Sequence, residues 1–273
     1  MRRPRPIGAY VVLTVAGLVA LLPVLWTLST SFKTQVEAQG YPPSLVPRDA
    51  TFDNYAGLFA SSDFVNALVT TGVVAVFATV LVLCVSYPCA YALVRMRPHG
   101  RGLLILLVTF AQTVPGIVFV IPLYSLSLRV GLYDTRLLLV LVYAGFLTPF
   151  ATLILSSFIR GLPVEIEEAA LVDGAGRLGV VLRIVLPMTR PGLASAAVFT
   201  GLYAWNEFLI PVILGGELAR PLTVYVASFV TQKTIEWGPL TAAVTVVLLP
   251  VVIVVVALQR HLVAGLTTGS MKG

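Results

Sequence analysis

The sequence predicts an all-α membrane protein that crosses the bilayer six times. Of its 273 residues, 58% are hydrophobic and only 11% are charged, whereas soluble domains average about 25% charged residues. The mean hydropathy is +0.96, and six apolar stretches have about the 20 residues that a spanning helix needs. We therefore treat these stretches as membrane helices.

The first of the six stretches follows a basic N-terminus, as the apolar part of a signal peptide does. Its apolar run is too long for a signal peptide, however, and no small-residue cleavage site follows it. We therefore expect a retained helix. The six predicted spans are residues 10–30, 64–94, 103–126, 137–158, 191–214 and 240–258.

Basic residues in the connecting segments predict the orientation. With the N-terminus inside, twelve Lys and Arg residues lie on the cytoplasmic side and six lie outside, and positive charge favours the inside. Both termini are thus expected in the cytoplasm. The inside set is Arg2, Arg3, Arg5, Arg95, Arg97, Arg101, Arg160, Arg177, Arg183, Arg190, Arg260 and Lys272, and the outside set is Lys33, Arg48, Arg129, Arg136, Arg220 and Lys233.

Residues 160–191 form a charged segment between apolar spans. Placing its charges at the bilayer centre would cost roughly 2.5 to 3.5 kcal/mol each, on the order of 20 kcal/mol together. We therefore expect the whole segment to lie in water, on the cytoplasmic face. Its charged residues are Arg160, Glu165, Glu167, Glu168, Asp173, Arg177, Arg183 and Arg190.

Within the charged segment, the pattern predicts two short helices joined at a glycine. Pro163 fits a first helical turn, and the glutamates follow where the helix dipole favours negative charge. Asp173-Gly174 marks a turn, and a second apolar segment, 178–186, ends at Pro187. The product would be a compact helical module over about residues 163–187. A plain connecting loop is the alternative, although such loops seldom need this length.

The expected organisation has three parts. Residues 1–60 hold the N-terminal tail, the first span and an ordered external loop, and residues 61–260 hold the core spans with the helical module. Residues 261–273 form a cytoplasmic tail.

The chain shows no chemistry of its own. It has no GxxxxGK[ST] phosphate loop, so we expect no ATP hydrolysis by this chain. Its histidines, His99 and His261, and its cysteines, Cys84 and Cys89, lack metal-ligand spacing, so no metal site is expected. No nucleophile and base are paired in the spans, which disfavours a membrane enzyme and leaves no catalytic residue to name. The basic residues punctuate apolar runs instead of forming one face, which argues against nucleic-acid binding.

Four residues are candidates for a solute path through the membrane. Glu207 is an acidic residue within a predicted span, and Trp205 and Asn206 beside it offer a stacking ring and an amide. A polar contact between helices, or a position near the external interface, is the alternative for Glu207. Gln112 lies near Pro115-Gly116, where a proline frees backbone groups that can line a path.

The charged segment resembles the EAA motif of permease subunits in ATP-binding cassette importers. The similarity covers Glu168-Ala169-Ala170, Asp173-Gly174-Ala175, and the later Ile184, Leu186-Pro187 and Pro191 at the family spacing. Similarity to the maltose-type second permease continues in Trp205-Asn206-Glu207-Phe208, Pro221-Leu222-Thr223, Trp237-Gly238 and the C-terminal Gln259-Arg260 to Gly273. Val181 departs from the family, where many members carry an aromatic residue.

This resemblance implies a type I importer fold in a bacterial cytoplasmic membrane. The implied partners are a second permease, two ATPase subunits that bind ATP and Mg²⁺, and an external solute-binding protein that delivers a sugar. It implies that the helical module is a coupling helix for the ATPase, with Glu168 as a charged contact and Gly174 as the turn. The residues implied at that contact are Glu168, Ala169, Ala170, Asp173, Gly174 and Ala175.

The solute class and the energy source have alternatives. No Lys or Arg lies inside a span, which favours a neutral di- or oligosaccharide, but helix N-termini can also bind anions, so a glycerol-phosphate-type or other small-solute importer stays open. An ion-coupled secondary transporter would need several intramembrane ionisable groups or an internal repeat. The spans offer only Glu207.

Overall fold

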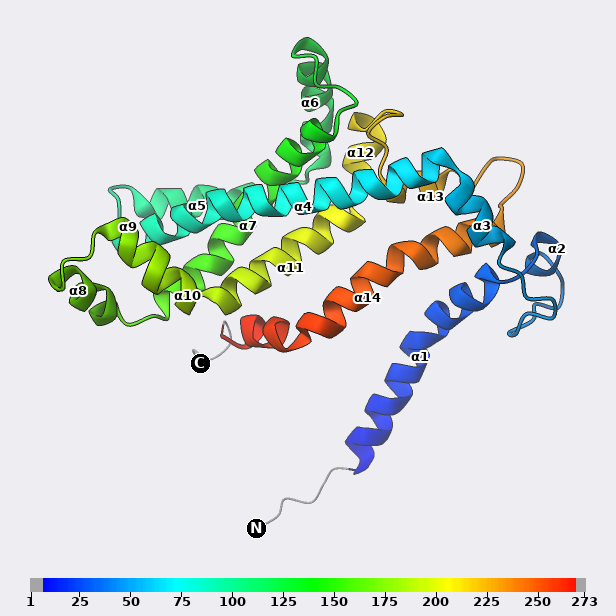
Figure 1. Cartoon of the computed structure of the whole chain (residues 1–273), viewed down its shortest axis with the longest axis horizontal. Coiled ribbons are helices and arrows are strands. Elements are labelled where there is room, and N and C mark those ends of the chain that lie inside the picture. The colour runs from blue at the N-terminus through cyan, green and yellow to red at the C-terminus, as the bar shows by residue number, and fades with distance from the viewer. Residues whose placement is uncertain (1–6, 269–273) are drawn as a thin grey trace. The chain divides into compact units, whose positions relative to one another are not determined.

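Helices make up the structure, a computed structural model that describes residues 7–268 (Figure 1). The predicted all-α class is confirmed. Within this range, Val230 and Ile235 form one isolated antiparallel bridge. The α-helices are α1 (Ile7–Ser31), α2 (Gln35–Ala38), α3 (Asp53–Ala60), α4 (Ser62–Tyr91), α5 (Arg101–Ala111), α6 (Ile117–Arg129), α7 (Arg136–Arg160), α8 (Val164–Val172), α9 (Arg177–Val180), α10 (Leu186–Met188), α11 (Arg190–Asn206), α12 (Leu209–Leu214), α13 (Leu222–Ala227) and α14 (Trp237–Thr268), and the π-helices are η1 (Ala92–Met96) and η2 (Val181–Val185).

Four of the six predicted spans are single helices. These are α1, α4 with its continuation η1, α7 and α14, and each is long and apolar enough to cross a membrane. A proline lies inside each of them without ending it: Pro23, Pro88, Pro149 and Pro250. The basic N-terminal residues 2–5 and Lys272 lie outside the described residues.

Each of the other two predicted spans is broken into two helices. Residues 103–126 form α5 and α6, because the chain leaves the helix at Gln112 and restarts after Pro115, which has no N–H to donate. Residues 191–214 form α11 and α12, because Glu207 adopts an extended conformation with φ −64° and ψ 132°. Both breaks fall at the proline and polar positions identified in the sequence.

The chain divides into two units. The first comprises residues 1–65 and 225–250, and the second comprises residues 66–224 and 251–273.

In the first unit, the segment between α1 and α4 is ordered by aromatic and polar contacts. The ring of Phe32 lies 5.2 Å from that of Phe52, and the Asn54 amide donates to the carbonyls of Ser31 and Lys33. Lys33 is 2% exposed, and its side chain donates to the Ser44 carbonyl. These contacts give the predicted loop a fixed conformation without a hydrophobic core of its own.

In the second unit, buried side chains of α4, α6, α7, α11 and α12 form one hydrophobic cluster. Helices α7 and α11 pack closely where Gly192 meets Phe158, because a Cβ on this glycine would lie 2.5 Å from the phenylalanine ring. The cluster joins the broken and unbroken helices into one core, to which the charged segment is attached.

Candidate functional site

The helical module, residues 164–188 in the structure, begins with α8. Pro163 stands before its first turn, which carries Glu165 and Glu167 as predicted. The helix ends in a Schellman motif, in which the Ala175 N–H donates to the Ala170 carbonyl and the Gly174 N–H to the Leu171 carbonyl. Gly174 has φ +86°, a conformation that glycine adopts without strain. The predicted glycine junction is therefore present.

The second half of the module is one short helical segment in three parts, α9, η2 and α10. It continues through Pro187, the expected end, to Met188. Pro187 occupies a first-turn position of α10, directly after the π-helical turn η2. After Met188 the chain bends by 74° into α11.

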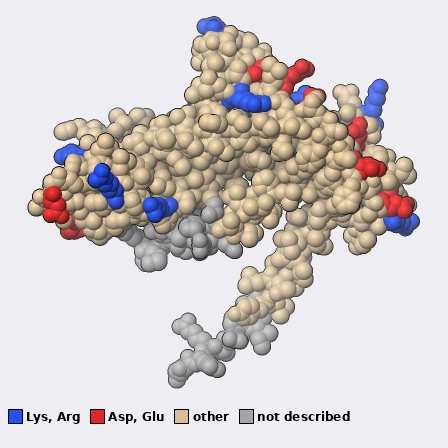
Figure 2. All heavy atoms as spheres, viewed as in Figure 1, with Lys and Arg blue, Asp and Glu red and all other residues tan. Residues whose placement is uncertain are grey.

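The six residues implied at an ATPase contact come together around the turn of the module. Glu168, Ala169, Asp173 and Gly174 are exposed, whereas Ala170 and Ala175 are partly buried. Val172 and Leu178 are 87% and 71% exposed beside them. Figure 2 shows acidic and basic side chains at this end of the second unit. The turn thus exposes small and apolar residues beside charged ones.

Glu167 does not lie in water, which corrects the expectation for the charged segment. Its side chain is buried, and one carboxylate oxygen accepts from Arg95 Nε at 2.6 Å. Tyr91 donates to the other oxygen at 2.9 Å, and Arg95 Nη2 donates to the Leu162 carbonyl at 2.9 Å. Arg95 therefore compensates the buried charge, so Glu167 needs no water.

A second contact joins α4 to the base of the module. The Tyr87 and Thr189 hydroxyls lie 3.0 Å apart, and Thr189 Oγ1 also donates to the Val185 carbonyl at 2.8 Å. Thr189 is the residue at the 74° bend. Tyr87, Tyr91 and Arg95 recur every fourth residue, so they share one face of the helix formed by α4 and η1. We call these residues the α4 stripe.

The three adjacent path candidates lie at the break between α11 and α12. Glu207 Oε1 accepts from the N–H groups of Leu209 at 3.0 Å and Ile210 at 3.2 Å, which caps the start of α12. Asn206 is exposed and donates to the Leu202 carbonyl, and Trp205 is partly buried against the core. The carboxylate thus caps a helix, a structural role that was not among the alternatives considered from the sequence.

The two broken spans approach each other in the core. A Cβ on Gly116, at the start of α6, would lie 3.9 Å from Ile210 of α12 and 3.7 Å from Phe146 of α7. Gln112, the remaining path candidate, is exposed at the end of α5 in the same break. The break at residues 112–116 therefore faces the start of α12, where Glu207 provides the cap.

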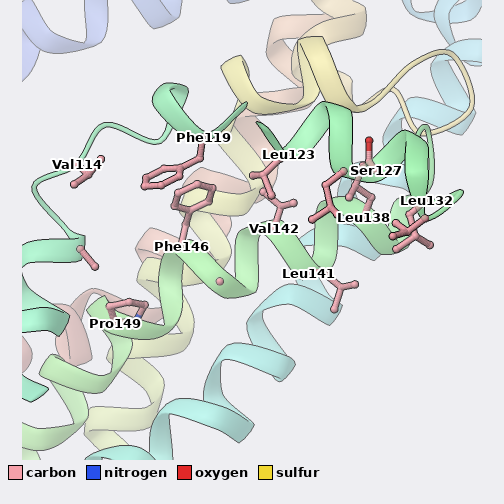
Figure 3. Close-up of a pocket in the computed structure, with 14 residues that line it drawn as sticks. Val114, Phe119, Leu123, Ser127, Leu132, Leu138, Leu141, Val142, Phe146 and Pro149 are labelled. Atoms are coloured by element: carbon pink, nitrogen blue, oxygen red, sulfur yellow. The ribbon is translucent and has the colours of Figure 1, made fainter. Parts of the chain in front are cut away.

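A cavity of about 480 Å³ lies between α6 and α7 (Figure 3). Its lining is apolar, and it includes the rings of Phe119 and Phe146, whose centroids are 5.9 Å apart. The hydroxyl in the lining, Ser127, already donates to the Tyr124 carbonyl at 2.7 Å. A sugar needs several polar partners, so this cavity is no candidate for the solute site.

Comparison with known proteins decides the family. Residues 83–268 match the family described as binding-protein-dependent transport system inner membrane component. The chain belongs to this family. It is 34% identical to the diacetylchitobiose uptake system permease protein NgcG of Streptomyces coelicolor, over 97% of this chain and 88% of that protein. It is 35% identical to the trehalose transport system permease protein SugB of Mycobacterium tuberculosis, over 93% of each.

The permease is also similar in fold to a solved structure. A chain of the bacterial ABC transporter that imports the acidic polysaccharide alginate superposes with a TM-score of 0.80 and 24% identity, over 93% of this chain and 95% of that one. The chain is thus an inner-membrane ABC transporter permease with the importer fold that its resemblance implied.

Proposed function

We propose that this permease pairs with a second permease to form the path by which an importer takes up a di- or oligosaccharide. A solute-binding protein delivers the sugar, and two separate ATPase subunits bind ATP and Mg²⁺ and supply the energy. The observation that carries the proposal is the exposed turn of the helical module in a chain of this family. Because the sequence has no phosphate loop for hydrolysing ATP itself, we assign this exposed turn to the docking of a separate ATPase subunit.

The helical module is the contact for one ATPase subunit. Exposed Val172 and Leu178 offer apolar area, and small Ala169 and Gly174 let the partner's surface approach the backbone. Glu168 is exposed at the same turn, where it can pair with a basic residue of the partner. ATP binding that draws the ATPase subunits together would move the module. Because the ATPase subunits would then bind the two conformations of the permease with unequal affinity, this movement would be converted into alternating access.

This role places the module and both chain termini in the cytoplasm. The excess of Lys and Arg in the segments on that side supports the orientation. The segment between α1 and α4 then lies outside, where a solute-binding protein arrives.

The sugar assignment rests on the relatives, whose names specify diacetylchitobiose and trehalose. Gln112, Trp205, Asn206 and Glu207 are the proposed contacts along the path. Tyr203 supports the last of these, because its hydroxyl interacts with the Glu207 carboxylate and the residue is 45% exposed. An exposed aromatic ring beside a carboxylate suits a sugar, which presents apolar faces and hydroxyl edges.

Matched glycine variants test the docking role. Gly174→Ala places a Cβ at φ +86°, whereas Gly176→Ala places one at φ −68° with no atom within 4 Å. Gly174→Ala and Glu168→Lys should reduce co-purification with the ATPase and uptake together, while Gly176→Ala should retain both. Normal association and uptake in Glu168→Lys and Gly174→Ala would contradict the docking role.

Binding measurements on the partner solute-binding protein test the sugar assignment. We expect calorimetry to detect binding of trehalose, diacetylchitobiose or a longer neutral oligosaccharide, and none of glycerol 3-phosphate. Selective binding of the phosphate ester would replace the sugar with an anionic solute. Uptake that survives ATP depletion but not collapse of the ion gradient would instead indicate a secondary transporter.

A further inference from the structure

The α4 stripe connects the helical module to the membrane helices at separate points. Tyr91 and Arg95 hold Glu167 of α8, and Arg95 also holds the Leu162 carbonyl just before that helix. Tyr87 holds Thr189 at the bend between the module and α11. Both ends of the module are therefore fastened to one face of one helix.

The fastening is buried, which makes it rigid. The Arg95 and Glu167 side chains are 11% and 8% exposed. Thr189 is 1% exposed. A buried ion pair that is also hydrogen-bonded has little freedom to separate, because separation leaves each buried charge without its partner. The module cannot move far without moving α4.

Room for such a movement lies beside the contact. A cavity of about 1000 Å³ is bordered by α4, η1 and the module, and Tyr91, Arg95, Glu167 and Val181 are among its lining residues. Both π-helical turns, η1 and η2, border it. Such turns are rare and often occur at functional sites, which fits a joint that bends while its ends stay attached.

The far end of α4 is fastened as well. Arg136 at the start of α7 donates to Asn66 and Thr70, and Asn66 donates to the Leu218 carbonyl. Thr71 accepts from the Leu222 N–H at 2.7 Å. From Asn66 to Arg95 a helix extends over about 44 Å at 1.5 Å per residue, enough to cross the bilayer.

We propose that α4 is the strut that carries displacement of the helical module to the opposite end of the second unit, with Arg95 and Glu167 as its positioning residues. This inference rests on the proposed docking of the module to an ATPase. It adds that docking and transmission are separate: Glu168 acts in the first, and the buried Glu167 beside it acts in the second.

The test uses the complete importer in proteoliposomes, with a nitroxide label as the probe. Cys84 and Cys89 are exposed on α4, so both become alanine, and Leu218→Cys, at the far end of the strut and 73% exposed, carries the label. The label's spectrum is compared without nucleotide and with ATP plus vanadate. We expect a spectral change in the otherwise unaltered importer and in Glu165→Gln, a control that removes an exposed carboxylate from the same helical turn.

Glu167→Gln and Arg95→Gln should still co-purify with the ATPase and hydrolyse ATP but should lose the spectral change. The double variant should behave like either single one, because the two residues act through each other. A spectral change that persists in the variants, or no change in the unaltered importer, would overturn the strut. Loss of ATPase association in Glu167→Gln would also overturn it, because the residue would then serve docking. Failure of Glu168→Lys to weaken association would refute the proposed function instead.

Discussion

Gly192 is a position where one added methyl group should disturb the packing of the permease. In Gly192→Ala, the new Cβ would lie 2.5 Å from Cγ, 2.7 Å from Cδ2 and 2.9 Å from Cβ of Phe158. Carbon atoms pack best at about 3.5–4.0 Å, so α7 and α11 must separate by roughly 1 Å or the ring must leave its rotamer. The atoms concerned lie near the Phe158 backbone, which limits how far they can move.

The magnitude follows from two opposing effects. Overpacking a core costs typically about 1–3 kcal/mol, whereas alanine in place of glycine favours a helix by roughly 0.5–1 kcal/mol. We expect Gly192→Ala to lower the free energy of unfolding by about 1–2 kcal/mol, which is about a tenfold change in the folding equilibrium. Unfolding by sodium dodecyl sulfate in mixed micelles, followed by circular dichroism, measures this.

Gly201 on the same helix is the matched control. A Cβ at that position meets only Thr79 Oγ1 at 3.4 Å, so Gly201→Ala should keep or raise the free energy of unfolding. Phe158→Leu should partly rescue Gly192→Ala by making room. The reasoning would be refuted if Gly192→Ala and Gly201→Ala were equally stable, or if shortening Phe158 gave no rescue.

Three further predictions concern single polar side chains. Asp134→Ala should lower the free energy of unfolding by about 1–3 kcal/mol, because the buried Ala219 N–H loses the carboxylate that accepts from it at 2.8 Å. Asp134→Asn, in which asparagine tolerates φ +56°, should lower it less in the same micelle titration. Equal losses in the two variants would contradict this. The Arg48 N–H donates to Glu37 and holds the pKa of that carboxyl below its ordinary value of 4.5, so the stabilisation is present above that value and is lost as pH falls through the lowered pKa. Hydrogen exchange at the Arg48 amide should show this loss of protection on acidification, and Glu37→Gln should abolish the pH dependence; an unchanged pH profile would contradict the role of Glu37. Glu207→Gln keeps an oxygen to cap α12, so the fold should persist while sugar uptake falls, and normal uptake would remove Glu207 from the path.

Local signals predicted the helical module well. The acidic first turn of α8 and the glycine junction at Gly174 depend on neighbours in sequence, and these suffice to fix a short helix and its Schellman motif. The local signals for the break at Pro115-Gly116 were also present. They do not decide between a continuous span and a break, because a proline in a membrane helix can be tolerated or can end it, depending on what satisfies the freed backbone groups.

The pairing of Glu167 with Arg95 could not be predicted from the sequence. Three glutamates near the start of one helix fit the helix dipole equally well, and only tertiary contact with α4 shows which one is buried. Its partner lies 72 positions earlier in the chain, and no local periodicity links the two. The roles of Gln112, Trp205 and Asn206 stay predictions, because they depend on a solute and a second permease.

The π-helical turn η1 bears on how the chain tolerates changes in length. A π-turn accommodates one residue more than an α-turn, so deleting one residue from Ala92–Val94 would let the helix return to regular winding. Arg95 would then lie three positions after Tyr91 instead of four, still on the same face of the helix. Each residue of an α-helix turns by about 100°, so a deletion in the regular part of α4, between Tyr87 and Tyr91, would rotate Tyr91 and Arg95 away from Glu167. A single-residue deletion should therefore uncouple the importer in α4 and be tolerated in η1.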